Sequence, residues 1–117
     1  ELFSHITVAQ ILWHNRISGQ EKPKWCLFDT IPTHLLLELN DSSNQAWQEL
    51  VINTSKSGFK ETVSYIDTIG DAHETVLRDI MTHVANHGTH HRGQIVAWLR
   101  AEDIAPPALD YLYFTRA

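Results

Sequence analysis

The sequence predicts an all-α fold, an antiparallel helix bundle forming one domain over residues 1–117. Three segments carry apolar residues at three- and four-residue steps, the spacing that lines one face of a helix. Glycine or proline lies beyond the end of each segment, as is typical of helix ends. A chain of 117 residues has room for one core and not for two. Three helices with one apolar face each can bury those faces only against one another, which predicts the bundle.

The first helix is predicted over residues 2–18, followed by a stop at Gly19. One side of it carries Leu2, His5, Ile6, Ala9, Leu12, Trp13 and Arg16. Residues 20–33 contain Pro23 and Pro32 and show no clear period, so we expect a loop there.

The middle of the chain predicts a short helical turn at residues 34–39 and a separate helix after it. Residues 41–43 (Asp-Ser-Ser) offer side chains that can accept from free backbone N–H groups, which indicates a helix start. That helix is expected to run to about Ser57 and to end at Gly58. Residues 59–71 alternate apolar and polar side chains in part, which favours a short extended connection or a small hairpin.

The last helix has the clearest pattern and is predicted from Ala72 or His73 to about Ala101. Its stripe contains Val76, Leu77, Ile80, Met81, Val84, His87, Gly88, His91, Gln94, Ile95, Trp98 and Leu99. Pro106 and Pro107 exclude a helical continuation.

Charge and composition exclude several classes of function. The formal net charge is −5 and the nine basic residues are scattered, which argues against a nucleic-acid partner. There is no run of about 18 apolar residues, so no membrane-spanning helix is expected. The single cysteine, Cys26, allows no intrachain disulfide, which fits a cytoplasmic protein.

Histidine is the unusual feature of the composition, since the chain has eight and five of them lie between His73 and His91. His87 and His91 are four residues apart, a spacing that lets two imidazoles on a helix converge on one metal ion. The glutamate of the H-E-x-x-H protease motif is missing between them. Both lie within the apolar stripe, where polar groups need partners, and one ion would satisfy both.

His5 is the predicted third ligand, because it lies on the inward face of the first helix, whereas His14 is half a turn away and should face outward. His83, one turn before His87, is either an alternative ligand or a residue that hydrogen-bonds behind the site. Gln94 can orient a ligand or can be a satisfied core amide, and close helix approach would explain Gly93. His90 is expected at an interface or in solvent, and His34 and His73 receive no role.

Residues 83–95 (HVANHGTHHRGQI) resemble the signature near the end of DinB/YfiT-like proteins. Residues 4–13 (SHITVAQILW) resemble the earlier histidine helix of that family, and residues 106–111 (PPALDY) resemble its ending. The resemblance implies an antiparallel four-helix bundle, often dimeric, that holds a divalent metal through His5, His87 and His91. It also implies that the family's first helix should precede Glu1, and without that helix part of the apolar face is expected to be exposed.

Three histidine ligands leave an open coordination position, the pattern of catalytic zinc sites. We expect zinc or nickel first, with iron, copper or manganese as alternatives. The resemblance implies a metal-dependent transferase acting on a small thiol, or a hydrolase of a small molecule, as a homodimer. The alternatives are a metal-binding stress-response bundle without catalysis and a helical interaction module without metal. Glu74 and Asp110 are the candidate acids for catalysis.

Overall fold

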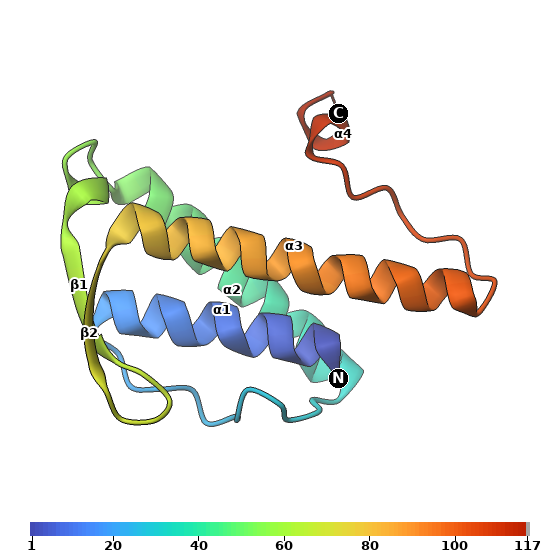
Figure 1. Ribbon diagram of the computed structural model, residues 1–117, viewed down its shortest axis with the longest axis horizontal. Coiled ribbons are helices and arrows are strands. Elements are labelled where there is room, and N and C mark those ends of the chain that lie inside the picture. The colour runs from blue at the N-terminus through green and yellow to red at the C-terminus, as the bar shows by residue number, and fades with distance from the viewer. Residues whose placement is uncertain (117) are drawn as a thin grey trace.

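The computed structural model describes residues 1–116. Three long helices, α1 (Leu2–Ser18), α2 (Thr33–Asn53) and α3 (Leu77–Ala101), run side by side (Figure 1). A 3₁₀ turn, η1 (Gly58–Lys60), and two strands, β1 (Thr62–Ile66) and β2 (Ala72–Val76), connect α2 to α3. A short helix, α4 (Tyr111–Arg116), follows α3 after an extended segment. The expected all-α four-helix bundle is therefore wrong, because the described chain combines helices with a small antiparallel sheet.

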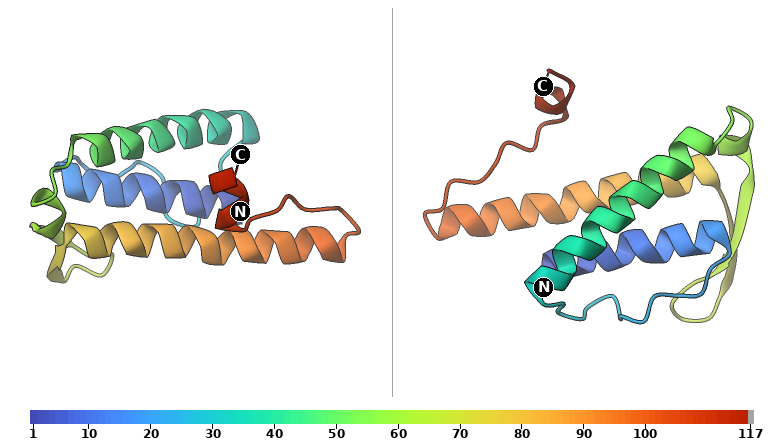
Figure 2. Two further views of the ribbon diagram at one scale, coloured as in Figure 1. Left: turned by 90° about the horizontal axis from the view of Figure 1, so that it is seen from above. Right: turned by 180° about the vertical axis from the view of Figure 1, so that it is seen from behind.

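The central position belongs to α1, which contacts both α2 and α3. Gly19 ends this helix in the left-handed conformation, with φ of 68°, as its position after the apolar period predicts. Figure 2 shows α2 and α3 on either side of α1 when the molecule is seen from above. The residues of α1 from Ser4 to Ala9 are all buried, so the histidine in this run lies in the most enclosed part of the helix.

One continuous helix, α2, replaces the helical turn and separate helix expected in the middle of the chain. Asp41 and Ser42 lie inside it, so the predicted helix start there is wrong. Polar residues of this kind weaken a helix by only tenths of a kcal/mol each, and no glycine or proline interrupts residues 33–53. Contacts with α1 continue across the predicted break, since Ser43 is buried and the indole N–H of Trp47 donates to the carbonyl of Gln10 at 3.1 Å.

The hairpin that was one of two expectations for residues 59–71 is present, but it reaches further along the chain. β1 pairs with β2 in antiparallel register from Thr62 opposite Val76 to Ile66 opposite Ala72. The last helix therefore begins at Leu77, and the predicted start at Ala72 or His73 is wrong. The backbone N–H of Leu77 donates to the carbonyl of Glu61 at 2.9 Å, so the hairpin caps the helix that follows it.

A small core fills the space between α1, α2 and the loop of residues 20–32. Its buried members include Val8, Ile31 and Leu36, and Trp25 and Leu27 pack against them. The loop thus forms one wall of the core although its sequence has no period. The side of α1 that faces away from α2 packs against α3.

The C-terminal segment stands apart from the helices (Figures 1 and 2). Four consecutive residues of α4, Tyr111 to Phe114, are 57–77% exposed. Trp98 near the end of α3 is also 60% exposed. Much of the exposed apolar surface of the described residues lies at this end of the chain. Among the described residues, no helix has the length and apolar character needed to cross a membrane.

Candidate metal centre

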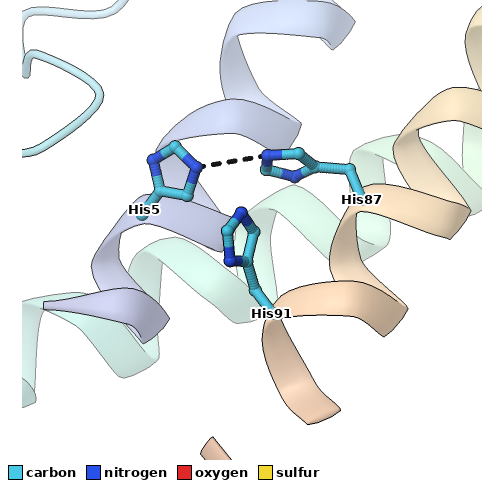
Figure 3. Close-up of side chains that lie close together, drawn as sticks. All are labelled: His5, His87 and His91. Atoms are coloured by element: carbon cyan, nitrogen blue, oxygen red, sulfur yellow. Dashed lines mark hydrogen bonds between the residues drawn. The ribbon is translucent and has the colours of Figure 1, made fainter. Parts of the chain in front are cut away.

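Three imidazoles meet between α1 and α3. His5 projects from α1, and His87 and His91 project from successive turns of α3 toward it (Figure 3). One ring nitrogen from each histidine lies within 4.8 Å of the others. The ring centroids are 5.0 Å apart for His5 and His87, 4.7 Å for His5 and His91, and 4.6 Å for His87 and His91. Helical spacing accounts for the pair on α3, and the packing of α1 on α3 brings in the third ring.

The separation of the nitrogens fits a shared ion. Two imidazole nitrogens on one tetrahedral zinc ion, each about 2.0–2.1 Å from it, lie roughly 3.3 Å apart. The Nε2 atoms of His5 and His87 are 3.2 Å apart. Without an ion, the same distance allows one ring to donate to the other. The donor set contains nitrogen only, and such sets suit zinc, nickel, copper and iron.

Neighbouring acceptors determine the tautomer of two of the three rings, that is, which ring nitrogen carries the hydrogen. Nδ1 of His5 lies 2.7 Å from the carbonyl oxygen of Leu27, which can only accept, so this nitrogen carries the proton. Nδ1 of His91 lies 2.6 Å from Oε1 of Gln94, and with that oxygen as acceptor it too carries the proton. In the neutral rings, Nε2 of His5 and of His91 then keeps a free lone pair, which is the form that binds a metal.

Burial and neighbouring charges keep the third ring neutral. Burial, followed by the positive charges that His91, His5, His83 and His90 can carry, lowers the pKa of His87 from 6.5 to about 4. At neutral pH this ring therefore holds no extra proton and has a lone pair available. A neutral imidazole is the form that binds a metal cation.

The other histidines lie outside this group. The His83 ring is 5.8 Å from that of His87 and packs edge-on against Trp13, so it borders the site. The exposed His90 ring is 5.0 Å from that of His91. His14 points away from His5, but it packs against Trp47 of α2 at 5.7 Å rather than facing solvent as predicted.

Neither candidate acid belongs to the three-imidazole group. Glu74 lies on β2, where it accepts from Ser64 at 3.3 Å, and Asp110 is exposed just before α4. His73, which received no role from the sequence, pairs with Asp67 at 2.7 Å in the hairpin. His34 is exposed on α2.

Two residues of the loop before α2 complete the surroundings of His5, and sequence reasoning missed both. Leu27 supplies the carbonyl described above, and the ring of Phe28 stacks on the His5 ring at 4.9 Å with 7° between the planes. No sequence signal could have identified them, because a backbone carbonyl is available on every residue and the loop has no period. The expected close approach of another helix at Gly93 is wrong, because no atom of another described element lies within 4 Å of the position that its Cβ would take.

Comparisons with known proteins identify the family and one relative of this chain. A family model described as "DinB family" matches residues 1–117. A curated protein of Bacillus subtilis (strain 168) named "Protein DinB" is 45% identical over 38 residues. That segment is 32% of this chain and 22% of the Bacillus protein, so the match covers only a small part of either.

Proposed function

The chain belongs to the DinB family, and from that premise and the geometry of its imidazoles we propose that His5, His87 and His91 bind one divalent metal ion. The observation that carries this proposal is the convergence of three ring nitrogens within 4.8 Å. The fixed tautomers of His5 and His91 support it, because they leave both Nε2 lone pairs free. Zinc and nickel are the preferred ions, and iron, copper and manganese are the alternatives.

We propose that the bound ion serves an S-transferase or hydrolase reaction on a small molecule. Three protein ligands leave a coordination position for water or a thiol, and a divalent ion lowers the pKa of either toward neutrality. The residues of this chain contribute the rest: Leu27 and Gln94 orient two rings, and Phe28 shields one face of His5 from water. A small thiol is the favoured substrate.

A second candidate is a metal-binding protein of the stress response that has no catalytic activity. One observation favours it, since the group of potential ligands in residues 1–116 contains three histidines and no carboxylate that could act as a base. The two candidates differ in whether a small thiol enters the coordination position. In cobalt-substituted protein, a sulfur-to-cobalt charge-transfer band on adding a thiol supports the transferase, and an unchanged spectrum supports the second candidate.

The primary test is the metal content of the purified protein by elemental mass spectrometry. We expect one equivalent of metal in the parent and loss of it in His87→Ala and in His91→Ala. His34→Ala is the matched control, because it removes an exposed imidazole on α2 that is not in the group. A parent protein that binds neither zinc nor nickel after loading would contradict the proposal and leave a helical interaction module.

We further propose that the protein is a cytoplasmic homodimer. The lone Cys26 is compatible with a reducing compartment. The exposed apolar residues of α4 and the exposed Trp98 offer surface that a second copy can cover.

A further inference from the structure

A cavity of about 720 Å³ lies beside the histidine cluster, between α1, the loop before α2 and the tip of the hairpin. Its apolar wall includes Val8 and Leu12 of α1 and Trp25 and Leu27 of the loop. This volume lies in the range of pockets that bind small molecules, and such pockets combine apolar walls with a few polar groups.

The charged groups of this cavity are mostly cationic. Arg16, Lys22 and Lys24 line it, and the only carboxylate in its lining is that of Asp67. These are three of the nine lysines and arginines in a chain whose net charge is −5, so positive charge is concentrated here against the overall balance.

None of the three cations forms a salt bridge within residues 1–116, where the ion pairs are His73–Asp67 and Arg78–Asp79. Asp67 is occupied by other partners: Oδ2 pairs with His73, and Oδ1 accepts from the backbone N–H groups of Ile69 and Asp71. The hydrogen bond from His73 is the main reason why the pKa of Asp67 lies below its usual value. Both Asp67 oxygens therefore already have partners, and none of the three cations forms a salt bridge in the cavity, although the Lys24 ammonium lies over the Trp25 ring at 4.5 Å.

Arg16 is held in place rather than free to swing away. Its guanidinium donates to the carbonyl of Ile66 at 3.0 Å and lies over the rings of Trp13 and Tyr65 at 4.6 and 5.1 Å. Only one of its five N–H groups is used by that hydrogen bond, so others remain for an anion. A cation fixed before binding loses little conformational freedom when a ligand arrives.

Two residues that line the cavity also contact His5 of the histidine cluster. Phe28 lines the cavity and stacks on His5, and Leu27 lines it while its carbonyl accepts from His5. Val8 lies three residues after His5, about 4.5 Å along the helix axis, and Arg16 lies roughly 16 Å along it. A ligand in the cavity would therefore have its anionic end at the hairpin and its apolar body pointing toward the imidazoles.

We infer that this cavity binds a small amphipathic anion, with its apolar body against α1 and the loop and its anionic head at Arg16, Lys22 and Lys24. The idea that the cavity recognises part of the substrate rests on the proposed function. Anion binding in the cavity does not depend on that function, because none of the three histidines lines the cavity.

The test compares octanoate with octanol, which differ in charge but hardly in apolar body, using metal-free protein treated with a chelator. The readouts are the dissociation constant from calorimetry and the indole N–H resonance of Trp25, assigned with Trp25→Phe. We expect octanoate to bind at least about tenfold more tightly than octanol and to shift the Trp25 resonance but not that of Trp98. We expect added salt to weaken octanoate binding, because the recognition is electrostatic.

A matched pair of variants locates the site. Lys22→Gln with Lys24→Gln should weaken octanoate binding by roughly three- to tenfold, because two partly exposed charges are lost. Lys56→Gln with Lys60→Gln, which removes two lysines outside the cavity, should leave the affinity unchanged. Equal binding of octanoate and octanol, or equal effects of the two double variants, would overturn the inference. Octanoate binding that persists in His87→Ala separates this result from the metal test, which can fail on its own.

Discussion

Single hydrogen bonds decide which nitrogens of the histidine cluster are free. The carbonyl oxygen of Leu27 and the amide oxygen of Gln94 each accept a hydrogen bond from Nδ1 of one ring, which leaves the lone pair on Nε2 of that ring free. Such partners also hold the plane of the ring, so that the lone pair points in one direction. The affinity of the site for a metal should therefore depend on residues that never touch the metal.

Gln94→Ala should weaken metal affinity by about tenfold or more, since partners of this kind contribute 10–100-fold. The physical reason is that the His91 ring loses the acceptor that fixes its tautomer and orientation. Competition with a chromophoric chelator measures the change. Gln45→Ala, which removes an exposed glutamine on α2, is the control. An unchanged affinity in Gln94→Ala would show that the packing around His91 alone orients the ring.

At the scale of elements, tertiary pairing overrides local preference at two places. Residues 72–76 continue the helical period of α3, yet they form β2 because residues 62–66 are available to pair with them. Residues 41–43 carry signals for a helix start, yet α2 passes through them because its buried face continues across the break. The contact partner is the neighbouring strand β1 for residues 72–76 and the helix α1 for the middle of α2.

Two glycines, one inside α3 and one directly after α1, give a test at this scale. Gly93 is exposed inside α3 with open space around it, so Gly93→Ala should raise the free energy of unfolding by about 0.5–1 kcal/mol. Gly19 also has open space, but its φ is 68°, so Gly19→Ala should destabilise by about 1 kcal/mol. Urea unfolding measures both changes. A loss of stability in Gly93→Ala would mean that another surface packs closely against this part of α3.

At the scale of the whole molecule, the helices form one body and the C-terminal segment lies outside it (Figure 1). Tyr111, Leu112, Tyr113 and Phe114 expose more apolar surface than a short helix normally leaves in water. Proline at positions 106 and 107 keeps the connection extended, which holds α4 away from α3. A second copy of the chain is the partner that the proposed dimer provides for this surface.

Leu112→Ser with Phe114→Ser should shift the protein from dimer to monomer, because both substitutions remove exposed apolar area without touching the histidines. Sedimentation velocity over a range of concentrations measures the shift. Ile69→Ser at the hairpin tip, which is 83% exposed, removes a comparable side chain elsewhere and should leave the assembly unchanged. A parent protein that is monomeric at all concentrations would refute the dimer.

Local patterns in the sequence determined the extent of α1, the end of α3 and the stripe on which His87 and His91 lie. Helical periodicity fixes which residues share a face, and glycine fixes where a helix can stop, so these features need no knowledge of the fold. The inward position of His5 follows from the same periodicity. The family resemblance also rested on contiguous residues, and the family model that matches residues 1–117 confirms it.

Only the tertiary structure decided which features of distant segments meet. It placed His5 of α1 within reach of His87 and His91, and it brought the loop carbonyl of Leu27 to the His5 ring. It also turned the predicted first turns of the last helix into a strand and formed the cationic cavity from three separate segments. These outcomes depend on contacts between different segments of the chain, and the periodicity of one segment carries no information about such contacts.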